Sequence, residues 1–160
     1  TEIVMTSGWT TVSNAFDLRM LVADIFGDLA FLVAEDEPGA ANTMNRWLHG
    51  SVVYRGPFIG RLECWTTPAF ARGLAVNMLG IDATEEPAAG TSEDALRELL
   101  NVLCGNLVTR RFGRDSVFDL GVPDVVPADQ APPKSGPDDA LGCLVYVDGE
   151  PFHCRVTDIE

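Results

Sequence analysis

The chain has 160 residues, of which 46% are hydrophobic and 22% are charged, a composition typical of one globular domain with its own core. Its formal net charge is −13, so no basic patch is available to bind a nucleic-acid backbone. Because no apolar run is long enough to span a membrane and no signal peptide is recognisable, we expect a cytoplasmic protein without a membrane partner.

The first third of the chain predicts one long helix. Residues 1–12 are β-prone but interrupted by Gly8, and they suggest an edge strand or an arm. Ser13 or Asn14 is a suitable N-cap for a helix that runs to about Ala34. The apolar residues of this helix recur at helical spacing and form a core-facing stripe of Leu18, Leu21, Val22, Ile25, Leu29 and Leu32.

Two strands and a second helix follow. Residues 51–58 and 60–65 predict a pair of strands joined by a turn rich in glycine and proline. Thr67 and Pro68 then fit the N-cap and first position of a helix that reaches about Leu79. An acidic connector leads from this helix to the next one.

The clearest helical pattern covers residues 93–111. Thr91 or Ser92 is the expected N-cap, and Arg110 and Arg111 lie in the last turn, where the helix dipole favours positive charge. Five leucines fall on one core-facing stripe, namely Leu96, Leu99, Leu100, Leu103 and Leu107. The sequence therefore predicts a long amphipathic helix with one buried and one solvated face.

The last part of the chain predicts β-structure. Residues 116–120 suggest a strand, whereas residues 121–139 contain five prolines and cannot lie in a central strand. Residues 141–147 and 151–158 predict a hairpin around an Asp-Gly turn, which is a strong hairpin signal.

The two long helices are similar to each other. After a shift of 78 residues, LRMLVADIFGDL from Leu18 aligns with LRELLNVLCGNL from Leu96, and the paired strands of the two halves also correspond. We interpret this as an internal duplication, with repeats at about 13–66 and 91–158 joined by a helix at about 68–79. The repeats belong to a single domain of residues 1–160.

The solvated face of the second long helix carries a polar pair that the first helix lacks. Glu98, Asn101 and Gly105 lie roughly 140° to 200° around the helix from Leu96. In the first helix, Met20 and Ala23 occupy the positions of Glu98 and Asn101. A glutamate and an asparagine three residues apart also occur on many ordinary helix surfaces, so the pair alone does not define a site.

The pattern Glu98-x-x-Asn101-x-x-x-Gly105 resembles the signature of the CheC/CheX/FliY chemotaxis phosphatases, which hydrolyse the aspartyl phosphate of a CheY-type response regulator. With one signature rather than two, the chain most resembles CheX. The resemblance implies that Asn101 orients a water for in-line attack and that Glu98 pairs with the regulator's active-site lysine. Gly105 would allow the regulator's backbone to approach, although close packing of the two long helices is an alternative explanation for it.

The resemblance also implies which partners and cofactors to expect. The partner is a phosphorylated, CheY-like receiver domain, which brings its own Mg²⁺, and the protein needs no cofactor of its own. A homodimer that pairs through an edge strand is also implied. The proline-rich stretch 121–139 is longer than the compact family pattern requires.

The remaining residues suggest structural roles. Cys64, Cys104, Cys143 and Cys154 show no metal-ligand spacing and are interpreted as buried thiols, and His49 and His153 as packing or strand-edge residues. No metal site is predicted.

We therefore predict an α+β fold in which two pseudo-symmetric helix-plus-strands repeats place their long helices on a largely antiparallel sheet. Two alternatives to phosphatase activity stay open. One is a non-catalytic module or scaffold that binds a response regulator through the same face, and the other is a small-molecule sensor with a pocket between the repeats.

Overall fold

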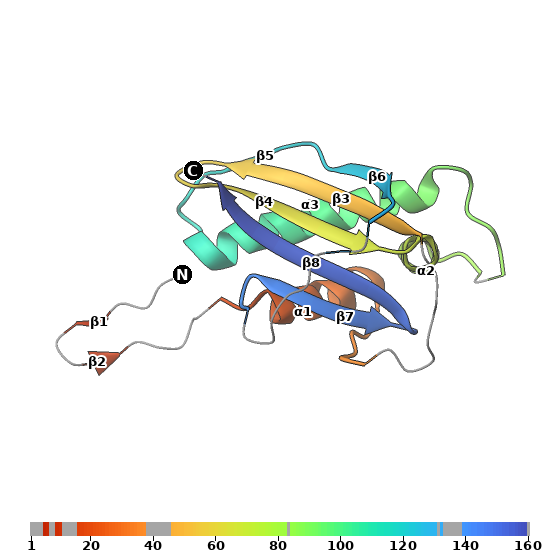
Figure 1. The fold of residues 1–160 in the computed structure, drawn as a ribbon, viewed down its shortest axis with the longest axis horizontal. Coiled ribbons are helices and arrows are strands. Elements are labelled where there is room, and N and C mark those ends of the chain that lie inside the picture. Colours follow the sequence, from red (N-terminus) through yellow and green to blue (C-terminus); the bar gives the residue numbers. More distant parts are fainter. Residues whose placement is uncertain are drawn as a thin grey trace.

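The computed structural model describes residues 5–6, 9–10, 16–37, 46–82, 84–130, 132 and 139–159. Three helices and eight strands are formed by these residues (Figure 1). The helices are α1 (Leu18–Ala30), α2 (Pro68–Leu79) and α3 (Thr91–Phe112). The strands are β1 (Met5–Thr6), β2 (Trp9–Thr10), β3 (Trp47–Arg55), β4 (Ile59–Thr66), β5 (Asp119–Leu120), β6 (Asp124–Ala128), β7 (Gly142–Val147) and β8 (Glu150–Ile159).

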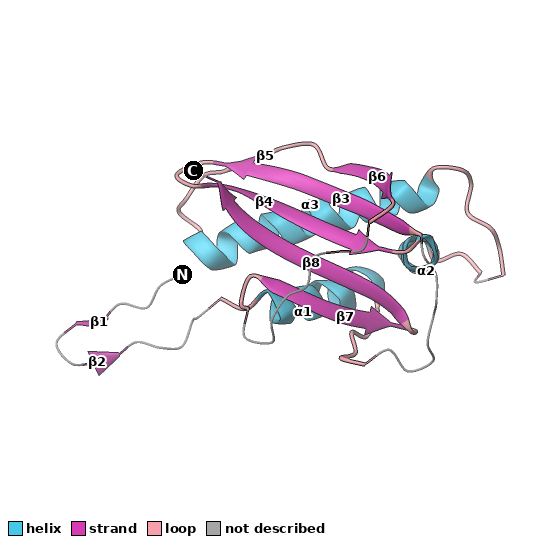
Figure 2. Cartoon of the chain, in the orientation of Figure 1, coloured by secondary structure: helices cyan, strands magenta, loops and turns pink. Residues whose placement is uncertain are grey.

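The main sheet has the order β5-β3-β4-β8-β7, and β6 also pairs with β3 on the side of β5. Every pairing between its described strands is antiparallel. Two hairpins, β3–β4 and β7–β8, are joined side by side through β4 and β8 at the centre. Figure 2 shows α1 and α3 as one layer behind the magenta sheet, so the predicted α+β fold with helices on a largely antiparallel sheet is confirmed.

The core lies between the sheet and the helices. Residues of β3 alternate in burial, with Leu48, Val52 and Tyr54 facing the helices. Helix α3 packs on β3 and α1 packs on β7. The five leucines predicted for the core stripe of α3 are all fully buried. Each buried leucine contributes about 2 kcal/mol, so this stripe fixes which face of α3 remains in solvent.

Helices α1 and α3 bury equivalent residues. The buried positions of α1 are Leu18, Leu21, Val22, Ile25, Phe26 and Ala30, and each residue 78 positions later is buried in α3. The two hairpins are likewise related across the central pair, where Cys64 faces Cys154. The two halves are thus equivalent in these positions, while the duplication itself stays a prediction.

The bounds of α1 differ from the prediction. The expected caps Ser13 and Asn14 lie outside the described residues, and Asp17 caps the helix by accepting a hydrogen bond from the Arg19 N–H at 2.9 Å. The helix ends at Ala30 because Phe31 adopts a left-handed conformation with φ of 56°. Glycine is the usual residue in that conformation, so the sequence contained no signal for this end.

The start of α3 also differs from the prediction. Thr91 and Ser92 were expected as N-caps, but both lie within the helix. The N-cap is Gly90, with φ of 86° and no side-chain hydrogen bond to the helix. The charges expected at the helix ends are present, with acidic residues in the first turn and Arg110 and Arg111 in the last. Helix α2 begins at Pro68 after the Thr67 cap, as predicted.

The proline-rich segment contains a strand that the sequence did not reveal. Residues 124–128 form β6 beside β3, with Pro127 opposite Leu48. Proline is tolerated there because β6 lies at the edge of the sheet, where it does not need hydrogen bonds on both sides. The strand expected at 116–120 is reduced to β5.

The remaining strand predictions concern the two ends of the chain. The β7–β8 hairpin is confirmed, and its turn residues Asp148 and Gly149 both have positive φ, as the predicted Asp-Gly turn requires. Near the amino end, β1 and β2 pair with each other rather than with the main sheet. No helix in the described part of the chain is long and apolar enough to cross a membrane.

Candidate functional site

The outward face of α3 is the candidate site. Burial of the leucine stripe leaves Asp94, Glu98, Asn101 and Thr109 exposed along the opposite side, with Gly105 half-buried among them. Glu98 and Asn101 are one turn apart, so their Cβ atoms are about 5–6 Å from each other. The structure therefore places both predicted polar residues where a partner protein can reach them.

The side chains of Glu98 and Asn101 make no hydrogen bond or ion pair with any described residue. Their polar neighbours on α3 are engaged locally. Asp94 pairs with Arg97 at 2.7 Å, and the Asn106 amide donates to the Val102 carbonyl at 2.9 Å. The Asn101 amide and the Glu98 carboxylate thus keep all of their hydrogen-bonding capacity for water or a partner.

Gly105 is not required for packing between the two long helices. A Cβ atom at Gly105 would have one neighbour within 4 Å, Leu120 Cδ1 of β5 at 3.9 Å, which is an ordinary contact. At the equivalent Gly27 of α1, a Cβ would meet nothing within 4 Å. Close packing of the two long helices therefore does not explain either glycine, and Gly105 is half-buried beside Leu120.

The first half presents the equivalent surface without the polar pair. Met20 is 63% exposed, and Ala23 is also exposed, at the positions that correspond to Glu98 and Asn101. The two helices bury equivalent positions, so their outward faces have the same orientation and differ in the side chains that they carry.

The carboxyl end of α3 is held by an ion pair with the central sheet. The guanidinium of Arg111 donates to both carboxylate oxygens of Asp158 on β8, at 2.8 and 2.9 Å, and also reaches the Tyr54 hydroxyl. The hydrogen bond from Arg111 holds the pKa of the Asp158 carboxyl below its usual value. This contact fixes the long helix that carries Glu98 and Asn101.

The cysteines and histidines have structural environments. All four cysteines are free and buried, and burial raises the pKa of Cys64, Cys104 and Cys143 to about 12, which makes these thiols poor nucleophiles. His49 bonds to Glu63 at 2.8 Å and stacks on Trp65, while His153 is buried. Among the described residues, no group of three or more His, Cys, Asp or Glu could hold a metal ion.

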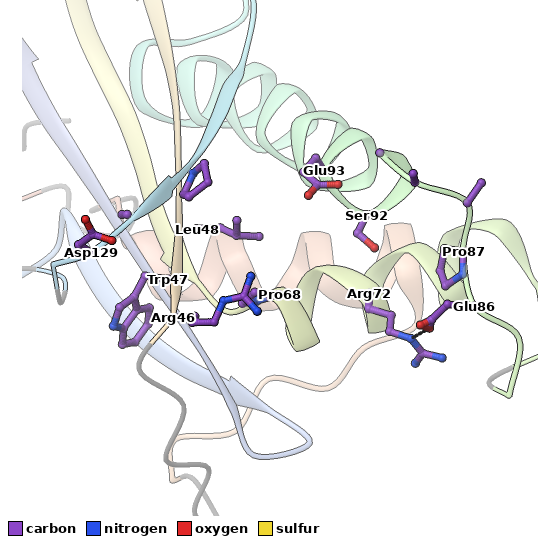
Figure 3. Close-up of a pocket in the computed structure, with 15 residues that line it drawn as sticks. Arg46, Trp47, Leu48, Pro68, Arg72, Glu86, Pro87, Ser92, Glu93 and Asp129 are labelled. Atoms are coloured by element: carbon purple, nitrogen blue, oxygen red, sulfur yellow. Dashed lines mark hydrogen bonds and ion pairs between the residues drawn. The ribbon is translucent and has the colours of Figure 1, made fainter.

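A cavity of about 550 Å³ lies away from Glu98 and Asn101. It forms where β3, α2 and α3 begin and β6 ends (Figure 3). Arg46, Ser92 and Glu93 line it together with apolar side chains such as Leu48 and Pro68. The sensor alternative required a pocket between the repeats. This cavity is lined by residues of both, such as Leu48 of the first repeat and Glu93 of the second, so the alternative stays a prediction.

No family model matches the chain, and no curated protein matches it by sequence. The arrangement of helices on an antiparallel sheet is nevertheless that of a known class, the chemotaxis proteins with the CheC and CheX fold. A CheX from Desulfovibrio desulfuricans is 14% identical, with a TM-score of 0.65 over 89% of this chain and 96% of the other. A CheC-like superfamily protein from Shewanella sp. PV-4 is 15% identical, with a TM-score of 0.66 over 90% and 96%.

A third similar structure is the CheX–CheY–BeF3–Mg²⁺ complex from Borrelia burgdorferi. It is 14% identical to this chain, with a TM-score of 0.60 over 89% of this chain and 96% of the other. At such low identity these likenesses establish the fold, which extends over nearly the whole of each compared protein.

Proposed function

We propose that this protein is a CheX-like member of the CheC/CheX/FliY group and hydrolyses the aspartyl phosphate of a CheY-type response regulator. The observation that carries the proposal is the exposed and unengaged pair of Glu98 and Asn101 on α3. The pair lies in a fold shared with CheX, and one of the similar CheX structures was determined together with CheY.

Asn101 has the chemistry required to position the attacking water. Its carboxamide oxygen accepts a hydrogen bond from water and its N–H₂ group donates, while the amide itself is not a competing nucleophile. The water oxygen forms a bond to phosphorus opposite the aspartyl oxygen, and the acyl phosphate P–O bond breaks. The regulator's aspartate is regenerated as a carboxylate, and the water proton leaves on inorganic phosphate or with solvent. Positioning supplies most of the catalysis in such a reaction.

Glu98 has a docking role in this proposal. Its carboxylate would pair with the lysine of the regulator's active site and so set the position of Asn101, one helical turn away. The Mg²⁺ of the reaction would be held by the regulator. Because Gly105 has no side chain, the regulator's backbone would be able to approach the helix at this position.

The test measures decay of a phosphorylated receiver domain from the same genome with wild-type protein and with the Asn101→Ala variant. We expect wild type to accelerate decay and Asn101→Ala to lose roughly 10²-fold in kcat while binding persists. Asn106→Ala is the matched control. It also removes a carboxamide from α3, but this carboxamide is already hydrogen-bonded to the Val102 carbonyl.

Two outcomes would contradict the proposal. Equal rates for wild type and Asn101→Ala would remove the amide from the mechanism. Binding of the phosphorylated receiver by wild type without faster decay would instead favour the non-catalytic scaffold.

A homodimer through an edge strand is part of the same proposal. The sheet ends in β5 and β6 on one side and in β7 on the other, where the backbone of Tyr146 is already bonded to Glu35. Light scattering at working concentrations should give the mass of a dimer, and a monomeric mass would reject this part of the proposal.

A further inference from the structure

An aromatic stack lies at the carboxyl end of the face that carries Asn101. Phe112, the last residue of α3, stacks on Phe58 of the β3–β4 turn with ring centroids 4.7 Å apart and on Phe118 at 5.3 Å. We call Phe58, Phe112 and Phe118 the aromatic stack. Phe58 is 55% exposed and Val117, beside Phe118, is 80% exposed, so the stack opens onto solvent.

The aromatic stack belongs to the same face as the candidate site. Phe112 follows Asn101 by eleven residues, which places it about 20° around the helix from Asn101 and about 16 Å along the axis. Leu120 of β5 lies near Gly105, with its Cδ1 3.9 Å from where a Cβ would be. Figure 1 shows the carboxyl end of α3 and the β3–β4 turn together at the end of the molecule marked C.

A protein interface of ordinary size reaches from Asn101 to the edge of the aromatic stack. A standard interface covers about 800 Å² on each partner, which is a patch of roughly 16 Å radius. A receiver domain whose phosphorylated aspartate sits over Asn101 would therefore reach Phe112 at the edge of the interface, and Phe58 stacks on Phe112. Aromatic side chains are enriched at such interfaces. In this stack Phe58 is the exposed ring, while Phe112 and Phe118 are half-buried and pack against the core.

An exposed arginine near the stack is available to bind a carboxylate of a partner. Arg110 pairs with Asp24 and Arg111 with Asp158, whereas Arg114, two residues after Phe112, is exposed and has no partner among the described residues. Three other arginines likewise have no ion pair with a described residue, and the adjacent Asp115 is exposed as well. A site that binds Mg²⁺ and phosphate is built from carboxylates, which makes the rim of a receiver's active site acidic.

From these observations we propose that the aromatic stack and Arg114 form a second anchor for the receiver domain, contacting an apolar side chain and a carboxylate beside its phosphorylation site. The inference rests on the proposed function and adds the surface that determines affinity for the partner. The polar pair acts on the phosphoryl group, and the second anchor holds the receiver in place.

The test titrates the protein with a BeF3–Mg²⁺-activated receiver domain and measures the dissociation constant for wild type, Phe58→Ala and Arg114→Glu. We expect Phe58→Ala to bind roughly tenfold more weakly. Arg114→Glu should bind more weakly, mainly because the association rate constant falls. Added salt screens the charges, so the difference in affinity from wild type should become smaller as the salt concentration rises. In turnover assays both variants should raise KM and leave kcat unchanged, whereas Asn101→Ala should lower kcat.

Phe31→Ala is the matched control, because Phe31 is 83% exposed at the end of α1 and does not belong to the aromatic stack. Arg114 makes no hydrogen bond or ion pair with a described residue, and the melting temperature of Arg114→Glu is measured to separate a loss of affinity from a loss of stability. Wild-type affinity in both Phe58→Ala and Arg114→Glu would overturn the second anchor and leave the proposed function intact. Failure of wild type to bind any activated receiver would overturn the proposed function and the anchor together.

Discussion

At the scale of a residue, Gly27 and Gly105 occupy equivalent helix positions, so substitutions at the two can distinguish an effect on folding from an effect on partner binding. Gly27 and Gly105 both have room for a Cβ atom, and glycine in a helix costs about 1 kcal/mol relative to alanine. The residue at Gly27 affects only the helix, whereas the residue at Gly105 would face the docked regulator. The two positions can therefore be tested as a pair.

We expect Gly27→Ala and Gly105→Ala each to raise the free energy of unfolding by about 0.5–1 kcal/mol, measured by urea denaturation. A larger side chain should distinguish the positions. Gly105→Leu should weaken binding of the phosphorylated receiver, and Gly27→Leu should leave it unchanged. Equal effects of the two leucine variants on binding would show that Gly105 is not at the interface.

A different glycine is required for packing. A Cβ atom at Gly60 of β4 would collide with the ring and hydroxyl of Tyr54, which is fully buried and cannot move aside. We expect Gly60→Ala to destabilise the fold by about 1–3 kcal/mol, seen as a lower melting temperature. Gly73→Ala in α2, where a Cβ meets nothing within 4 Å, is the control and should not destabilise.

At the scale of elements, the ion pair between α3 and β8 links stability to pH. The hydrogen bond from Arg111 lowers the pKa of Asp158 in the folded protein. The ion pair therefore stabilises the fold fully above the pKa that aspartate has in the unfolded chain, about 3.9. This stabilisation is lost as the pH falls through the lower pKa of the folded protein. The stability difference between wild type and Asp158→Asn should therefore be largest above about pH 4 and should vanish on further acidification.

This prediction is checked by urea denaturation across the acid range. Asp115→Asn removes one negative charge from an exposed residue that has no ion-pair partner among the described residues, and it serves as the control. A constant difference between wild type and Asp158→Asn at every pH would mean that the pair does not act through the charge of Asp158.

The periodic elements were predictable from the sequence because their patterns are local. The leucine stripe of α3 determined its outward face and thereby exposed Glu98 and Asn101, and the Asp-Gly turn identified the β7–β8 hairpin. Strand β6 was missed because an edge strand tolerates Pro127 and depends on β3 for its pairing. The end of α1 was missed because Phe31 occupies a conformation that usually needs glycine.

The candidate site also has one part that a local sequence pattern predicts and another part that no such pattern predicts. Glu98 and Asn101 belong to one helix, so their spacing alone places them together. The aromatic stack joins residues from a turn, a helix end and a loop that are far apart in the chain. No local pattern brings these phenylalanines together, and only the folded structure reveals the cluster.

At the scale of the whole molecule, the central position of β4 and β8 predicts where the fold is most resistant to opening. These two strands are each paired with a strand of six or more residues on both sides, whereas β3 has only the short β5 and β6 on its outer side and β7 lies at the other edge. We expect native-state hydrogen exchange to be slowest for amides of β4 and β8 and faster in β6. Uniform protection across the main sheet would show that it opens only as one unit.

The same central pairing affects how the protein is made. Strand β8 is the last element along the chain, yet it fills the middle of the sheet by pairing residues 152–159 with residues 59–66. A ribosome therefore exposes the β3–β4 hairpin and all three helices before the strand that unites them has left the exit tunnel. Pairing across so many residues is slow because the intervening loop must close first. During that interval the nascent chain carries Glu98 and Asn101 on a helix whose supporting sheet is incomplete.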